Sequence, residues 1–213
     1  RAEGIVVHET ANPGGTAEMH YRYFNSAKRN ASAHAFVDWD EIIQTIPWDE
    51  QAGHAGGYAN RRYIGIELCR PKSYDKDKFM KVWKKGVWLF AYLYVYELGL
   101  LEVSKDNLLS HDEVRIRFGG TTHTDPVAYF KEYGFTVDDF RQEVQFKVEE
   151  INKGKKDKII NWKDIIYKVL SNPEQWEKAI NIITNIAKTE GNLGDLEILK
   201  YLPELIEKLY MRG

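Results

Sequence analysis

Short apolar runs alternate with helical patterns over residues 1–152, and this alternation limits the chain to a small set of folds. The runs are rich in β-branched residues and are bounded by turn-forming residues, as in short strands; they fall at residues 5–8, 33–38, 42–46, 64–68 and 108–111. The longest helical pattern covers residues 75–98 and ends at Gly99. Strands interleaved with helices that can cover them predict an α/β layered domain.

Two stretches between these patterns carry loop signals. Residues 52–63 are rich in glycine and small side chains, which predicts a long loop, and a glycine-containing loop is also expected after residue 111. Asp125-Pro126 then opens a short helix, because proline is well tolerated at the first helical position. His20 lies on an earlier helical pattern that Thr16 can cap, and we interpret it as a packing residue.

The composition changes near Asn152. Lysine, glycine and aspartate dominate the residues that follow, so residues 153–160 are predicted to form a charged, flexible linker. Three further helical patterns predict a small all-helical C-terminal domain over residues 161–213; they cover residues 162–170, 173–188 and 193–210. The expected organisation is therefore an α/β domain, a linker and a helical domain.

The overall composition argues against several classes of protein. A net charge of −2 argues against nucleic-acid binding, which normally needs a clustered excess of basic side chains. Cys69 is the only cysteine, which excludes an internal disulfide and a cysteine-rich zinc module, and its apolar neighbours predict an inert core thiol. No apolar run approaches the roughly 20 residues that span a bilayer, so no membrane partner is expected.

Two histidines and one aspartate occupy positions that suit a metal. His8 and His111 each end an apolar strand pattern, where side chains can project from a sheet edge into a cleft, and Asp125 lies in a loop ahead of a helix. Two imidazoles and one carboxylate form a suitable three-ligand set for catalytic zinc, with a fourth position left for water. The alternative is that both histidines are partly buried polar residues and that Asp125 caps a helix.

Glu67 is unusual because it lies in an otherwise apolar strand pattern, between Ile66 and Leu68 and facing opposite to both. A carboxylate on a buried strand is costly unless it is paired or faces a cleft. Glu67 is therefore either a functional base or a solvent-facing edge residue. His123, two residues before Asp125, can share a loop with it and reach the same site.

Seven stretches occur in one order over most of residues 4–135: IVVHETAN (5–12), SAHAFVD (32–38), IQ (43–44), AGHAG (52–56), Asn60 followed by IGIE (64–67), SH (110–111) and TDP (124–126). Each is short, but in this order they resemble the N-acetylmuramoyl-L-alanine amidases of the type-2 amidase family. That family includes phage endolysins, bacterial autolysins and the related peptidoglycan recognition proteins. The resemblance implies a central mixed β-sheet flanked by helices.

The resemblance also implies roles for individual residues. His8, His111 and Asp125 match the three zinc-ligand positions of the family, which implies one catalytic Zn²⁺. Glu67 matches the acidic residue that serves as general base in the catalytic members. His123 matches a position that is often lysine and is assigned to stabilising the developing oxyanion.

Three further residues map near the substrate groove of the family: His34, His54 and Asn60. They are expected either to contact substrate or to support the groove. Ala33 departs from the tyrosine that often precedes the His34 position, so the contribution of that hydroxyl is absent from this chain.

The function implied by the resemblance is zinc-dependent hydrolysis of the amide bond between N-acetylmuramic acid and L-alanine in bacterial peptidoglycan. The alternatives are a module that recognises peptidoglycan without cutting it and a zinc peptidase acting on stem-peptide bonds. The helical tail is interpreted as a wall-binding domain or as a helical interface, which would form a homodimer or dock onto the amidase domain. The layout favours a phage endolysin, which passes from the host cytoplasm to the cell wall, over a secreted autolysin.

Overall fold

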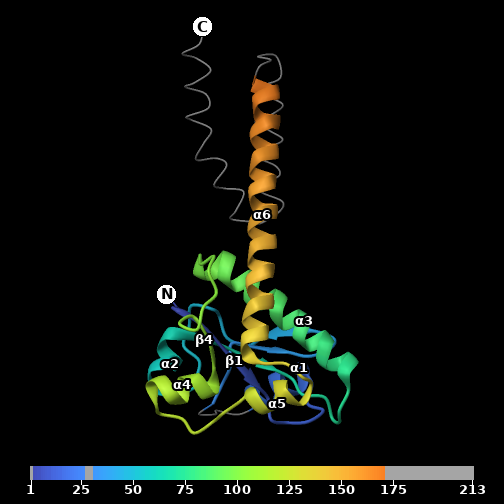
Figure 1. Cartoon of the computed structure of the whole chain (residues 1–213). Helices are drawn as coiled ribbons and strands as arrows, with labels where there is room; N and C mark the ends of the chain where they lie inside the picture. Colours follow the sequence, from blue (N-terminus) through green and yellow to red (C-terminus); the bar gives the residue numbers. More distant parts are fainter. Residues whose placement is uncertain (1, 27–30, 171–213) are drawn as a thin grey trace. The chain divides into compact units, whose positions relative to one another are not determined.

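The computed structural model describes residues 2–26 and 31–170, with side chains described up to residue 155 (Figure 1). The chain divides into two compact units, Arg1–Asn152 and Lys153–Gly213, and the first contains the whole described sheet. No helix of this described part is both long and apolar enough to cross a membrane. The helices predicted over residues 173–188 and 193–210 lie outside the described residues.

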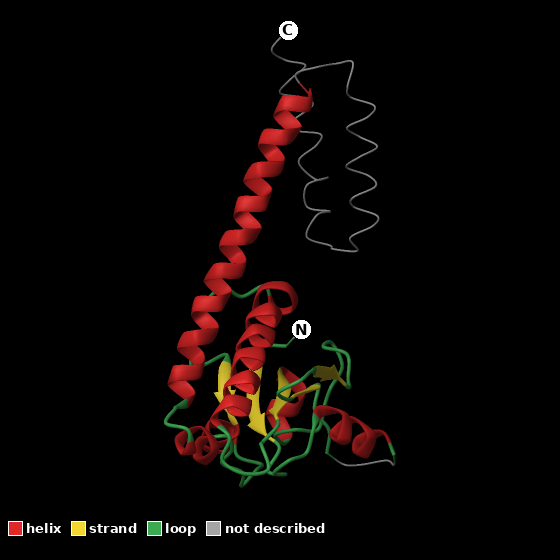
Figure 2. Ribbon diagram, turned by 90° about the vertical axis from the view of Figure 1, so that its right-hand side faces the viewer, coloured by secondary structure: helices red, strands yellow, loops and turns green. Residues whose placement is uncertain are grey.

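A five-stranded mixed sheet with strand order β3-β2-β4-β1-β5 forms the centre of the first unit, and Figure 2 shows helices on either side of it. β1 pairs in parallel with β4 and β5, β2 pairs in parallel with β4, and β3 runs antiparallel to β2. The strands are β1 (Gly4–Glu9), β2 (Ala35–Val37), β3 (Ile42–Gln44), β4 (Tyr63–Leu68) and β5 (Leu108–Ser110). The predicted α/β fold with a central mixed sheet is confirmed.

The longest helical pattern of the first 152 residues forms one continuous element. α3 (Lys76–Tyr92) begins where Asp75 accepts a hydrogen bond from the backbone amide of Lys78. It continues as a π-helical segment, η1 (Leu93–Leu98), and ends at Gly99, whose φ of 63° lies in the left-handed region that favours glycine. The helix predicted over residues 75–98 is therefore confirmed.

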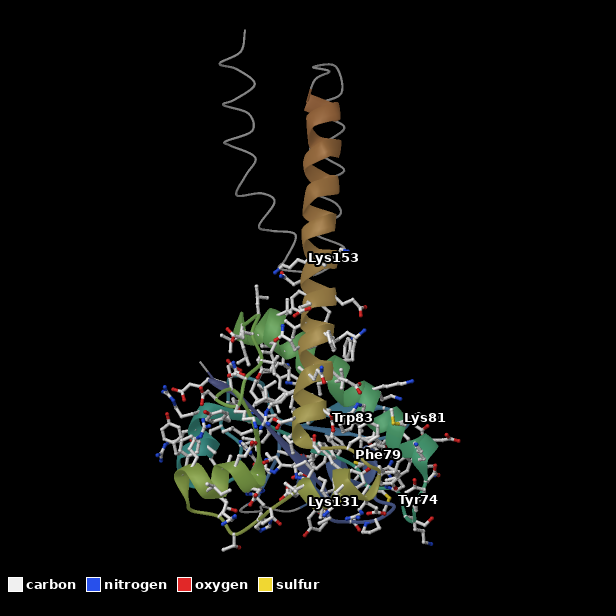
Figure 3. All side chains as sticks on the ribbon, viewed as in Figure 1. Tyr74, Phe79, Lys81, Trp83, Lys131 and Lys153 are labelled. Atoms are coloured by element: carbon white, nitrogen blue, oxygen red, sulfur yellow. The ribbon has the colours of Figure 1, made fainter. Side chains whose placement is uncertain are left out.

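Aromatic side chains of α3 pack against those of residues 129–140 and form much of the core. Phe79 and Trp83 are both buried and are labelled in Figure 3. Phe79 stacks on Tyr133 with 4.1 Å between ring centroids, and Trp83 meets Phe140 edge-on at 5.0 Å. Such pairs stabilise the fold beyond the burial of their apolar surface.

Two other helices lie where the sequence places them. α1 (Ala17–Asn25) begins after Thr16, whose side chain accepts a hydrogen bond from the helix, and α5 (Val127–Glu132) begins directly after the Asp-Pro pair. His20 is buried, and its ring stacks on Phe36 with 5.1 Å between centroids. The packing role expected for His20 is consistent with this contact.

Two short helices lie where the sequence predicts loops. α2 (Gly57–Arg62) occupies the end of the predicted loop 52–63, and its first residue has no side-chain cap. α4 (His111–Phe118) buries only His111 and Val114, so it shows no helical periodicity of apolar residues. Its usable signal is the capping box in which Ser110 and Glu113 bond to each other's backbone amides.

The flexible conformation predicted for residues 153–160 is incorrect, because these residues lie inside a helix. Their role as a linker between two domains stays a prediction. α6 (Val137–Leu170) runs through this segment without a break and includes the predicted helix 162–170. Lysine is a good helix former, and the single interior glycine, Gly154, costs only about 1 kcal/mol relative to alanine. High charge was therefore a poor guide to flexibility here. The division into an α/β domain and a functional tail remains a prediction; the boundary between the two compact units falls after Asn152.

Cys69 is a buried free thiol, as expected from its apolar neighbours. Burial raises the pKa of its thiol, and the charges of Asp38 and Glu67 raise that pKa further. A thiol held protonated in this way is a poor nucleophile and a poor metal ligand.

Candidate active site

Polar side chains gather where the parallel strands end. His8 lies one residue before the end of β1 and is paired in register with Glu67 on β4. His111 directly follows β5. Its backbone amide donates to the carbonyl oxygen of Asp125 at 3.0 Å, which holds the loop before α5 at the same edge. Open α/β sheets bind their ligands at the carboxyl ends of the strands, so this edge is the candidate site.

Side-chain atoms of His8, His111 and Asp125 converge on one point. Nδ1 of His8 lies 3.0 Å from Nδ1 of His111 and 3.1 Å from Oδ2 of Asp125, while Nδ1 of His111 lies 3.0 Å from Oδ1 of Asp125. Both imidazoles are almost completely buried, with 1% and 5% of their surface exposed. Residues more than 100 positions apart in sequence are thus brought together as predicted for a metal site.

This donor set fits a zinc ion. Two imidazoles and a carboxylate are a ligand set of catalytic zinc, and the second nitrogen of each ring is hydrogen-bonded away from the point of convergence. Burial opposes ionisation of Asp125, but hydrogen bonds with His111 and His8 outweigh it and lower the pKa of the carboxyl group. The carboxylate is therefore charged at neutral pH, as a metal ligand must be.

Glu67 lies beside this group and is held in an unfavourable environment for a charge. Its Oε2 atom is buried and has no hydrogen-bond partner among the described residues. Burial, followed by the negative charges of Asp125 and Glu9, raises the pKa of Glu67 to about 8. A cation nearby would lower this pKa again, toward the range that suits a general base at neutral pH. The geometry favours a functional carboxyl group over a solvent-facing edge residue.

His123 lies at the exposed rim of the site. Its side chain is 69% exposed, and its Nδ1 atom is 3.8 Å from Oδ1 of Asp125. The His123 ring stacks on His111 with 4.9 Å between centroids. The imidazole can therefore reach a bound substrate, and it is not itself placed as tightly as the three candidate ligands.

Two adjoining pockets open at this edge. The first has a volume of about 400 Å³ and is lined by the candidate ligands, by Glu67 and His123, and by the loop at residues 53–56. The second has a volume of about 420 Å³ and lies along α1, with mainly apolar walls formed by Met19, His20, Tyr23, Phe24 and Phe36. Both pockets include Glu67 and Phe24, so together they can take an extended substrate.

The three residues expected near the groove have different surroundings in the structure. His34 is buried; its Nδ1 atom accepts from the Gly65 amide, and its Nε2 atom bonds the Glu50 carbonyl oxygen. Asn60 lines the first pocket, but its Oδ1 atom accepts three backbone N–H groups of residues 54–56. These bonds favour structural support over substrate contact for both. His54 lines the pocket and contacts His8.

Two residues that contact the site, Thr121 and Glu9, are not predicted as site residues from the sequence. The Oγ1 atom of Thr121 is 2.8 Å from Nε2 of His111, and the Glu9 amide donates to Oδ2 of Asp125 at 3.4 Å. Each is a sequence neighbour of a residue already singled out, and that proximity is the only available clue. Ala33 is buried and lines the first pocket, where its methyl group offers no hydroxyl.

The fold and the site define an α/β domain with a candidate metal centre at the edge of its mixed sheet. The sequence profile described as N-acetylmuramoyl-L-alanine amidase (Amidase_2) matches residues 1–128. The chain belongs to this N-acetylmuramoyl-L-alanine amidase family.

Relatives of this chain are bacterial proteins of greater length. Protein Ami of Listeria monocytogenes is 36% identical over 196 residues, which is 90% of this chain. A bifunctional autolysin of Staphylococcus epidermidis is 32% identical over 140 residues, or 64% of this chain. The chain spans 19% of Ami and 10% of the autolysin. The match to Ami is long enough to extend beyond the profile match and into the tail.

Two solved structures have a similar fold. The crystal structure of the Staphylococcus aureus hydrolase AmiA in complex with its ligand matches with a TM-score of 0.64 and 30% identity, covering 70% of this chain and 73% of AmiA. The catalytic domain of XlyA matches with a TM-score of 0.53 and 30% identity, covering 67% of this chain and 86% of XlyA.

Proposed function

We propose that this chain hydrolyses the amide bond between N-acetylmuramic acid and L-alanine in peptidoglycan, with one Zn²⁺ held by His8, His111 and Asp125. The convergence of these three side chains beside Glu67 is the observation that carries the proposal. Membership of the amidase family supports the substrate class.

Glu67 is assigned the proton transfers. Its carboxylate accepts a proton from the attacking water as the water oxygen bonds to the amide carbonyl carbon, and it then returns that proton to the departing amine nitrogen of L-alanine. The pocket shared by Glu67 and the candidate ligands is large enough to hold the scissile amide between them. Bound zinc would supply Lewis acidity at the carbonyl oxygen and at the water.

His123 is assigned to the developing oxyanion. Its exposed ring at the rim can donate a hydrogen bond to the carbonyl oxygen as negative charge builds up on it. A neutral imidazole is sufficient for this role, and a protonated ring beside a zinc ion would be electrostatically disfavoured.

One rival function differs from the proposed one in the site it needs, and the other differs in the bond that is cut. A recognition module has no need for a complete ligand set or for a buried carboxyl group beside it, yet this chain has both. A zinc peptidase acting on stem-peptide bonds would use the same groups and differs in the bond that is cut. The identity of the released fragments therefore separates all three functions.

The proposed partner is bacterial peptidoglycan, and the proposed place of action is the cell wall. Ami and the staphylococcal autolysin are bacterial proteins, so a secreted autolysin and a phage endolysin both remain open proposals. For the tail we favour wall binding over dimerisation. Deleting residues 155–213 should reduce binding to purified walls; unchanged binding together with loss of a dimer in sedimentation would support the interface instead.

Mass spectrometry of the soluble fragments released from purified peptidoglycan tests the proposed reaction. We expect free stem peptides that begin with L-alanine, lost on chelation and restored by zinc. Tight wall binding without release would identify a recognition module, and shorter peptides would identify a peptidase.

A further inference from the structure

A chain of hydrogen bonds runs from His8 into the protein. The Nε2 atom of His8 lies 2.9 Å from Nδ1 of His54, and Nε2 of His54 lies 3.0 Å from the carbonyl oxygen of Tyr63. A carbonyl oxygen can only accept a hydrogen bond, so Nε2 of His54 carries the proton and donates it. In the neutral ring Nδ1 of His54 is then an acceptor, and Nε2 of His8 must be the donor. The remaining nitrogen of His8, Nδ1, faces His111 and lies 3.1 Å from the Asp125 carboxylate, and its lone pair would be the one available to a bound metal.

The ring of His54 is held in place by close packing. A Cβ atom at Gly65 would lie 2.3 Å from this ring, so β4 leaves room for His54 only because residue 65 is glycine. The ring of His34 also meets His54 edge-on, with 5.8 Å between centroids.

The other candidate zinc histidine lacks this constraint. Nε2 of His111 faces the Oγ1 atom of Thr121 at 2.8 Å, and a hydroxyl group can either donate or accept. Thr121 therefore orients the His111 ring without dictating which nitrogen carries the proton. His54 differs because its second nitrogen is committed to a carbonyl oxygen.

We propose that His54 is a positioning residue that fixes His8 in the Nε2–H tautomer and so presents Nδ1 to the metal. Both nitrogens of His54 are used in this series of hydrogen bonds. Of the two roles expected for His54, support of the groove is therefore favoured over contact with substrate. The inference rests on the proposed function only for the identity of the metal. Which nitrogen of His8 binds the metal can be measured without any turnover.

Long-range ¹H–¹⁵N NMR spectra of the zinc-loaded wild-type protein test the tautomer directly. We expect His8 to carry its proton on Nε2 and His54 to do the same. Zinc bound through Nε2 of His8, with the proton on Nδ1, would overturn the proposal. This measurement needs no variant and no turnover, so it stays decisive even if the protein proves not to be an amidase.

Zinc affinity, measured by competition with a chelator, tests the consequence. His54→Leu should weaken zinc binding about 10- to 100-fold, the usual effect of removing a group that orients a ligand. His54→Asn should lose less, because its amide oxygen can still accept from His8. His20→Leu is the matched control: it removes another buried histidine and should leave zinc affinity unchanged. A folded His54→Leu protein with wild-type zinc affinity would contradict the role.

Discussion

The sheet edge and the aromatic core lie in the same compact unit but satisfy their side chains in opposite ways. In the core, Phe79 and Trp83 pack against other rings at close distances. At the edge, Glu67 buries a carboxyl oxygen that has no hydrogen-bond partner in the described part of the chain. Within that part the core also leaves one polar atom, Nε1 of Trp83, without a partner, but a neutral N–H group costs far less to bury than a carboxylate.

The difference shows where the fold keeps groups that do not stabilise it. A cluster of buried ionisable side chains with a strongly raised pKa is typical of functional sites, whereas close aromatic packing is typical of structural regions. Substitutions at the edge should therefore remove activity at little cost in stability, and substitutions in the core should do the reverse.

The largest effect is expected at a metal ligand. Asp125→Ala removes the only carboxylate among the three converging side chains, so bound zinc and stem-peptide release should both fall by more than about 100-fold, beyond the effect of losing an orienting group. Zinc content by elemental analysis and fragment release by mass spectrometry measure the two losses. Stoichiometric zinc in the purified variant would remove Asp125 from the ligand set.

The core gives the opposite expectation. Trp83→Ala deletes a ring that is 1% exposed and should lower the free energy of unfolding by about 3–5 kcal/mol. Urea denaturation measures this loss. The folded fraction should still bind zinc, so a variant that is stable but cannot bind zinc would break the contrast between edge and core.

The pH dependence of stability sharpens the contrast at Glu67. A carboxyl group whose folded pKa is raised from 4.5 to about 8 favours the folded state at low pH, and this contribution is lost as pH rises between those values. Glu67→Gln abolishes the titration. With zinc removed from both proteins, the variant should gain thermal stability over wild type as the pH increases from 5 to 8. A difference in melting temperature that is constant with pH would contradict the raised pKa.

The smallest effect is expected in α6, beyond the domain core. Gly154→Ala should stabilise the helix by about 1 kcal/mol, because no atom crowds the added methyl group and alanine favours the helical backbone. Gly154→Pro is the matched opposite and should interrupt the helix. Circular dichroism measures both changes. If neither variant changes the helical signal, residues 153–160 do not form a stable helix, and the predicted flexible conformation would be correct.

In residues 1–152 the strands and long helices lie where the apolar patterns predict them, because burial of one face imposes a regular spacing on apolar residues. The helix at residues 75–98 and the strand pattern around Glu67 were readable for this reason. Short helices with few buried residues carry no such period, which explains the two predicted loops that contain α2 and α4. Residues 153–160 are helical despite their high charge and one glycine, because lysine is a good helix former.

The candidate site was predictable as a set of residues but not as a network. Family motifs pointed to His8, His111 and Asp125, and the structure brings them together. The hydrogen bonds made by His54 and Thr121 depend on ring orientations and on the space beside Gly65, which sequence patterns do not encode.

The most direct test of the catalytic assignment is to measure zinc content and stem-peptide release on the same preparation of Glu67→Gln. The substitution keeps the shape of the side chain and leaves all three converging ligands in place. We expect zinc to remain stoichiometric while release falls by about 100-fold or more, since a positioned proton-transfer group typically contributes that much. Undiminished release with zinc bound would contradict the assignment of Glu67 as the base.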